Sequence, residues 1–152
     1  MKVCDDFMSN TRFKLSEEKK QELHEKNREA TRKAMRIALQ TVEAFFNEVV
    51  NEANNPYMNE HMRISNKKSF LTDPLYMQNI IIYISTMLVD SLLDDLEIKL
   101  LLHCRVTAVD ISYNPHDKDL LMITFEYPNN NEIESYRIVV PCRVKDNLIY
   151  FN

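Results

Sequence analysis

The first half of the chain carries apolar residues at helical spacing, and the second half carries them at alternate positions. Between residues 34 and 53 they fall on roughly half of a helical circumference, which predicts an amphipathic helix. Ser16 suits its N-cap, and Asn54-Asn55-Pro56 suits its end. We therefore expect an arm over 1–15 and a helix over 16–55. The apolar positions are Ala34, Met35, Ala38, Leu39, Val42, Phe45, Phe46, Val49, Val50 and Ala53.

The first half of this helix is charged rather than amphipathic. The face that is apolar further along carries Lys20, His24, Asn27, Arg28 and Thr31 here. This half is therefore expected to project from the domain, to pack on a polar partner, or to be disordered.

A second helix is expected over residues 74–98. Asp73 can cap it, and Pro74 suits the first helical position because its missing N–H leaves no bond unmade. The polar stripe is narrow, so the helix should be buried on most of its circumference. Its apolar run is about half of the roughly 20 residues that a bilayer requires. The apolar positions are Ile80, Ile81, Ile82, Ile84, Met87, Leu88, Val89, Leu92, Leu93 and Leu96.

After Lys99 the period changes to two, which predicts four antiparallel strands in a meander over 99–152. Asn114-Pro115-His116-Asp117, Pro128-Asn129-Asn130-Asn131 and Lys145-Asp146-Asn147 are the expected connectors. The predicted fold is a single α+β domain over 1–152, with the long N-terminal amphipathic helix and the buried second helix packed on one face of the meander.

The chain contains no glycine among its 152 residues. A P-loop, a dinucleotide-binding fingerprint and a nucleophile elbow all need glycine, so none of them is expected in its usual form. The frequent Asn, Ile and Lys point to an AT-rich genome, for which a virus or phage is one source.

The net charge of −4 provides no overall attraction to nucleic acid or to an anionic membrane. The first residues lack the apolar region of a secretory signal. Cys4, Cys104 and Cys142 are odd in number and widely spaced, which suits free thiols in a reducing compartment. We expect a cytoplasmic protein, in the host cytoplasm if it is viral, with no membrane partner.

Metal and catalytic sites are not expected. Cys104 and Cys142 lie on apolar strand faces and can meet only if their strands are neighbours, while His103 points to the opposite face. His24, His61 and His116 fall on separate predicted elements, so no catalytic arrangement converges. No cofactor is expected.

Two clusters are candidate binding surfaces. Asp90, Asp94, Asp95 and Glu97 lie near the predicted end of the second helix, where carboxylates oppose the helix dipole. They can hold a divalent ion or a basic partner, or can form the solvated edge of the helix. The second cluster consists of basic residues with glutamates interleaved, which favours a solvated or helix-pairing surface over phosphate binding. Its members are Lys19, Lys20, Lys26, Arg28, Arg32, Lys33 and Arg36.

These patterns favour a non-enzymatic intracellular interaction, adaptor or regulatory protein that self-associates through its helices as a homo-oligomer. The candidate interface residues are Phe45, Phe46, Leu88, Leu92, Asp90 and Asp94. One alternative is a nucleic-acid-binding regulator that uses the basic residues of the first helix. Another is a ligand-binding or hydrolytic pocket between helices and sheet, with Asp90, Tyr83 and His103 as its polar groups.

Overall fold

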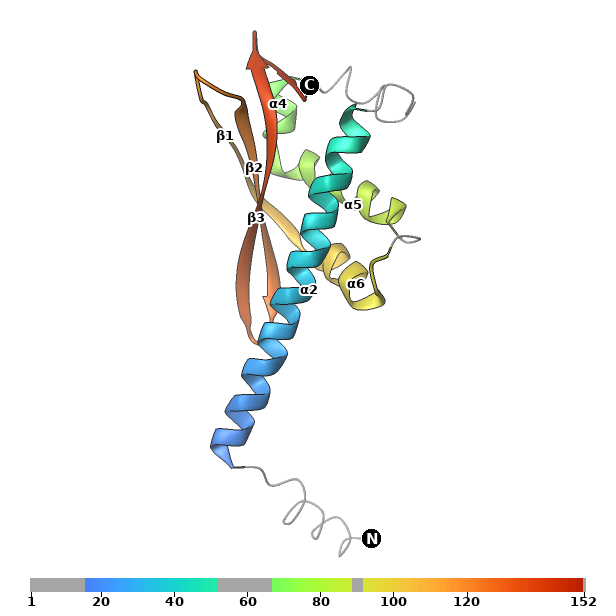
Figure 1. The fold of residues 1–152 in the computed structure, drawn as a ribbon, viewed down its shortest axis with the longest axis vertical. Helices are drawn as coiled ribbons and strands as arrows, with labels where there is room; N and C mark the ends of the chain where they lie inside the picture. Colours follow the sequence, from blue (N-terminus) through green and yellow to red (C-terminus); the bar gives the residue numbers. More distant parts are fainter. Residues whose placement is uncertain (1–15, 52–66, 89–91, 152) are drawn as a thin grey trace, which may run out of the picture.

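The computed structural model describes residues 16–51, 67–88 and 92–151, and it confirms the predicted α+β fold (Figure 1). Within these described ranges, four helices precede a four-stranded antiparallel sheet. The elements are α2 (Glu17–Asn51), α4 (Lys68–Leu71), α5 (Pro74–Met87), α6 (Asp95–His103), β1 (Arg105–Ser112), β2 (Asp119–Asn129), β3 (Glu132–Lys145) and β4 (Leu148–Tyr150).

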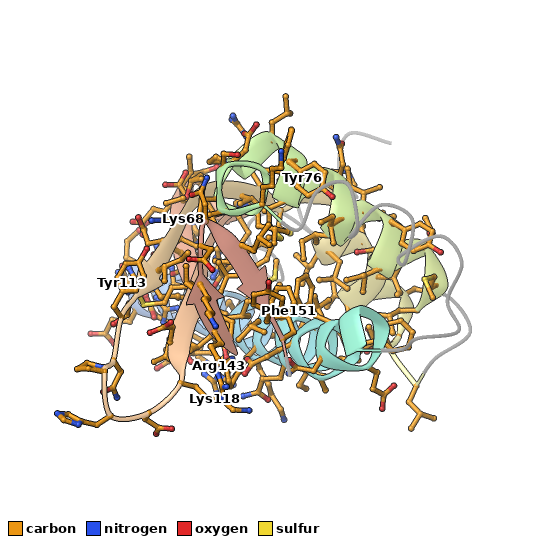
Figure 2. All side chains as sticks on the ribbon, turned by 90° about the horizontal axis from the view of Figure 1, so that it is seen from above. Lys68, Tyr76, Tyr113, Lys118, Arg143 and Phe151 are labelled. Carbon is orange, nitrogen blue, oxygen red and sulfur yellow. The ribbon has the colours of Figure 1, made fainter. Side chains whose placement is uncertain are left out.

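The sheet is the predicted meander, in the order β1-β2-β3-β4. Ile123 of β2 lies opposite Val109 of β1 and Ile138 of β3, so apolar side chains line up across the sheet on its inner face. A register shift between Val106 and Ala108 marks an irregularity in β1. The sheet curls around this inner face, and helices α2 and α5 fill the space (Figure 2).

One cluster of buried side chains joins the helices to the sheet. Met35, Leu39 and Phe46 from α2 are fully buried in it, together with Ile81 of α5 and Phe125 of β2. Phe46 also meets Phe151 edge-to-face, with 5.7 Å between ring centroids. The described part of the apolar face predicted for α2 therefore packs in the core, apart from the half-buried Phe45, while Ala53 and the side chains of Val49 and Val50 lie outside the description.

The start signals of α2 and α5 are used as predicted. The Ser16 hydroxyl accepts from the Lys19 N–H at 3.2 Å, and the Asp73 carboxylate accepts from the Leu75 N–H at 3.0 Å. The predicted end of the first helix at residues 54–55 lies outside the described residues. Among the described helices, none is both long enough and apolar enough to cross a bilayer.

The prediction of a single second helix over 74–98 was wrong, because two helices lie there. Helix α5 ends at Met87, and α6 begins at Asp95 with the Asp94 carboxylate accepting from the Glu97 N–H at 2.8 Å. Asp94 thus caps a helix N-terminus, where the helix dipole favours negative charge. The expected conflict with a helix C-terminus does not exist for Asp94, Asp95 and Glu97, and Asp90 lies outside the described residues.

The predicted boundary of the meander at residue 99 was also wrong. Residues 99–103 belong to α6, and the first strand begins at Arg105. A short apolar run such as residues 100–102 fits the period of a helix as well as that of a strand. Here the cap at Asp94 starts a helix that continues through this run. His103 therefore ends a helix, with its Nδ1 at 2.8 Å from the Lys99 carbonyl oxygen, instead of lying on a strand.

Asparagine and aspartate replace glycine in the hairpin turns, as expected. Asp146 and Asn147 join β3 to β4 with φ of 54° and 67°, and Asn130 joins β2 to β3 with φ of 52°. In the β3–β4 turn both central residues, Asp146 and Asn147, have positive φ. This is the type I′ pattern, whose twist matches that of the flanking strands. These residues tolerate the left-handed region better than most, because their short polar side chains bond locally.

We predict that Asn147→Ala lowers the free energy of unfolding by about 1 kcal/mol, because a Cβ without a local hydrogen bond is strained at this φ. Asn147→Gly should be neutral or slightly stabilising. Urea denaturation followed by circular dichroism measures both variants. Asn131→Ala is the control, because Asn131 also lies in a hairpin turn but does not have a positive φ. Equal losses for Asn147→Ala and Asn131→Ala would contradict the strain explanation.

Candidate functional site

The predicted interface residues separate into core and surface. Phe46 and Leu88 are buried in the core cluster, whereas Phe45 is half-buried and Leu92 is fully exposed. Asp94 is occupied as a helix cap, and Asp90 lies outside the described residues. Of this set, Phe45, Leu88 and Leu92 come together at one surface feature.

That feature is an apolar groove of about 510 Å³ between α2 and the segment around the end of α5. Ile37 and Met87 remain 39% and 37% exposed along it. Its lining residues are Ile37, Thr41, Phe45, Met87, Leu88, Leu92 and Leu93. Sequence reasoning missed Ile37, Thr41, Met87 and Leu93 as members. The four-residue spacing of Ile37, Thr41 and Phe45 marks one side of α2, but the opposite wall forms only through tertiary packing.

The charged half of α2 packs on a polar partner within the chain, the β2–β3 hairpin. Arg32 donates from Nε to both carboxylate oxygens of Glu134 at 2.9 and 3.0 Å, and from Nη2 to Oε1 at 2.7 Å. Glu134 also accepts from the Tyr127 hydroxyl at 3.1 Å and from Asn129 Nδ2 at 3.0 Å. The neighbouring Arg28 pairs with Glu132. The bidentate contact between Arg32 and Glu134 fixes the orientation of the two side chains as well as the distance between them.

Two further bonds join the hairpin to the backbone of α2. Asn129 Nδ2 donates to the Arg28 carbonyl at 3.0 Å, and Asn130 Nδ2 donates to the His24 carbonyl at 3.3 Å. Below this contact, α2 extends past the hairpin (Figure 1). The charged half was predicted to project from the domain, to pack on a polar partner or to be disordered. Residues 24–32 pack on a polar partner, which is the hairpin. The helical turns before them project from the domain.

This arrangement bears on the nucleic-acid alternative. Arg28 and Arg32 are paired with glutamates, and Lys20 Nζ lies 3.6 Å from Glu17 Oε1. Lys19, Lys26, Lys33 and Arg36 remain as exposed cations of the described helix. Arg28 and Arg32 are therefore already paired with carboxylates of the chain, which leaves them less available to a phosphate.

The two described cysteines are structural. Burial raises the pKa of Cys104 to about 12 and that of Cys142 to about 11, so both thiols stay protonated at neutral pH. Cys104 precedes Arg105, which pairs with Glu126, whereas Cys142 pairs with Asp119. Glu126 and Asp119 are seven positions apart on β2, which is a distance of roughly 20 Å along the strand. The two thiols therefore cannot share a metal ion, and no His, Cys, Asp and Glu cluster among the described residues can hold one.

The two described polar groups of the predicted pocket, Tyr83 and His103, do not line the same recess. Tyr83 belongs to α5, and His103, at the end of α6, lines a recess of about 100 Å³ with Arg105, Glu126 and neighbours. Asp90 lies outside the described residues.

A larger polar recess lies at the β1–β2 loop, beside the labelled Tyr113, Lys118 and Arg143 (Figure 2). The Asp119 carboxylate organises it by accepting from the Asn114 N–H at 2.9 Å and the Val144 N–H at 3.0 Å. These bonds, with the charge of Arg143, lower the pKa of Asp119. The carboxylate holds the loop against β3.

Comparison with protein-family models, curated protein sequences and solved structures found no match to this chain.

We predict that Glu134→Gln lowers the free energy of unfolding at neutral pH by about 1–3 kcal/mol. The Arg32 guanidinium, aided by Asn129 and Tyr127, lowers the pKa of Glu134 to about 2. The pKa of a glutamate in an unfolded chain is about 4.3, so the ionised carboxylate stabilises the fold above that pH. This stabilisation is lost as the pH falls through the folded pKa. The difference between the two proteins should therefore shrink from about pH 5 towards pH 2.

Urea unfolding at several pH values measures that difference. Because Asp119 also has a lowered pKa, wild type and variant must be compared at each pH. Glu132→Gln is the matched control on the same hairpin, since the Glu132 side chain is 63% exposed and should contribute less than about 1 kcal/mol. If the difference in free energy of unfolding between wild type and Glu134→Gln did not change with pH, this role of the carboxylate would be contradicted.

Proposed function

We propose that this chain is a non-enzymatic intracellular interaction protein that self-associates through its helical layer. The observation that carries the proposal is the apolar groove between α2 and the end of α5, with Leu92 fully exposed beside it. Scattered apolar residues are normal on a protein surface, whereas contiguous ones that line a groove are typical of interaction sites.

The proposed occupant of the groove is a second copy of the chain. The same patch contains a concave part, bounded by Ile37 and Phe45, and a projecting part, Leu92. A two-fold contact brings each projecting part against the concave part of the other copy, so one patch supplies both halves of the interface. Burying a leucine side chain in this way contributes about 1.5–3 kcal/mol.

We predict that Leu92→Asp weakens self-association at least about tenfold, because a carboxylate replaces an apolar contact worth more than about 1.4 kcal/mol. Sedimentation velocity over low to tens-of-micromolar concentrations measures the equilibrium. Leu75→Asp is the matched control, because Leu75 is 71% exposed on α5 but does not line the groove. Its association should equal that of wild type.

Two outcomes would overturn the proposal. One is a wild-type protein that sediments as a monomer throughout this concentration range. The other is equal weakening by Leu92→Asp and Leu75→Asp, which would mean that the effect comes from added charge rather than from the groove.

A further inference from the structure

One end of the sheet carries a surplus of positive charge. Three segments form this basic end: residues 67–71, the β1–β2 loop over 113–119, and residues 143–148 around the β3–β4 turn. They are joined by the Lys68 N–H, which donates to the Asn147 carbonyl at 2.8 Å, and by the Val144 N–H, which donates to the Asp119 carboxylate. Together they contain five lysines and arginines but three aspartates, in a chain whose net charge is −4.

Two of the three aspartates are occupied by the backbone of the basic end. Asp119 accepts from the N–H groups of Asn114 and Val144, and Asp117 accepts from the Lys118 N–H at 2.8 Å. The cations, in contrast, form no ion pair with any residue that the structure describes. They are Lys67, Lys68, Lys118, Arg143 and Lys145.

The strand register sets two of these cations against each other. Asp119 of β2 pairs with Cys142 of β3, so Lys118 and Arg143 face each other one position further along the ladder. Both line the polar recess at the β1–β2 loop, and Figure 2 shows the two labelled side chains close together. Like charges directly opposite on a sheet repel each other. An anion held between Lys118 and Arg143 removes this repulsion.

Two exposed aromatic rings flank the cations. Tyr113 is 56% exposed and lines the recess, whose volume is about 680 Å³. Lys68 Nζ lies 5.2 Å from the centroid of the Tyr113 ring, a cation–π contact that orients the ring. Tyr150, which is 38% exposed, pairs with Arg143 across β3 and β4. The recess is in the size range of sites that hold small organic ligands, so a nucleotide unit fits it.

We propose that the basic end binds single-stranded nucleic acid, with phosphates held by Lys118, Arg143 and Lys145 and a base stacked on Tyr113. None of these residues lines the apolar groove. The inference therefore does not rest on the proposed self-association.

The combination of cations and exposed rings favours nucleic acid over an acidic peptide. Each nucleotide supplies a phosphate charge and an aromatic base, whereas an acidic peptide supplies charge alone. A single strand can present the face of a base to a protein ring, which a stacked duplex does not. This location differs from the basic residues of α2 that the sequence suggested, of which Arg28 and Arg32 are paired with glutamates.

Fluorescence anisotropy of the full chain with a labelled single-stranded DNA of about 16 nucleotides tests the inference. Wild type should bind at low salt and weaken steeply as the salt concentration rises. Arg143→Gln combined with Lys145→Gln should lower the affinity at least about tenfold. It should also reduce the slope of log affinity against log salt by about 1.4, because each phosphate contact on a single strand contributes about 0.7.

Lys26→Gln combined with Lys33→Gln is the matched control. It removes two exposed cations from α2 and changes the net charge by the same amount. Its affinity and its salt dependence should stay close to those of wild type. Circular dichroism of both double variants verifies that the fold is retained.

Tyr113→Ala tests the base contact. Loss of the ring should weaken binding of the oligonucleotide about fivefold or more. Binding of inorganic polyphosphate, which has no bases, should stay unchanged. Tyr113→Phe keeps the ring and should bind the oligonucleotide as wild type does.

Three results would overturn the inference. The first is a wild-type chain that does not bind the oligonucleotide at low salt. The second is equal weakening by the sheet pair of substitutions and the α2 pair. The third is an oligonucleotide that binds no more tightly than polyphosphate or polyglutamate of equal charge, since the basic end would then recognise charge alone. Sedimentation of the wild-type chain tests the proposed self-association separately, so the two can fail independently.

Discussion

The contact between Arg32 and Glu134 determines how the longest element of the structure sits on the sheet. A helix of 35 residues can rotate about its axis or slide along it unless something fixes both. The apolar face of α2 fixes the rotation only over its second half. The bidentate arginine pair, on the first half, adds an orientation that a point contact between charges would not provide.

This polar contact is well satisfied, and its energetic role follows from that. Glu134 accepts from Arg32, Asn129 and Tyr127, so its carboxylate exchanges hydration for directed bonds in a partly buried position. A buried pair of this kind often adds little net stability compared with an apolar alternative, but removal of one partner is costly. Its bidentate geometry restricts how α2 can sit on the sheet, which is a contribution to specificity more than to net stability.

Local patterns predicted the elements, and long-range contacts explain what they missed. Alternation along β2 and β3, the cap at Asp73 and the turn residues Asp146 and Asn147 act over a few positions, so sequence alone identified them. The division of the second helix was missed because the acidic residues around Asp94 were interpreted as the end of one helix. Their spacing also fits an N-cap and first turn, and only that alternative places their charge favourably.

The candidate site was harder to predict for a similar reason. Arg32 and Glu134 are 102 positions apart, and nothing in either segment identifies the other. Phe45 and Phe46 have similar sequence environments, yet one lines the groove and the other is buried against Phe151. A difference of one position is 100° of helix rotation, and over this half of α2 that rotation is set by packing against distant parts of the chain. The sequence therefore identified the apolar residues that could form an interface, but it did not show which of them are buried in the core and which lie at the surface.

The same dependence connects the hairpin to the exposed apolar surface. Around α2 lie three sectors: one in the core, one held by Arg28 and Arg32, and one that lines the groove. Because a helix is rigid in cross-section, any rotation that loosened the arginine contacts would turn the groove-lining side chains of α2 by the same angle. The hairpin glutamates therefore position a surface that they do not touch. A chain without glycine suits such an arrangement, since α2 has no flexible residue at which the projecting half could turn independently of the core half.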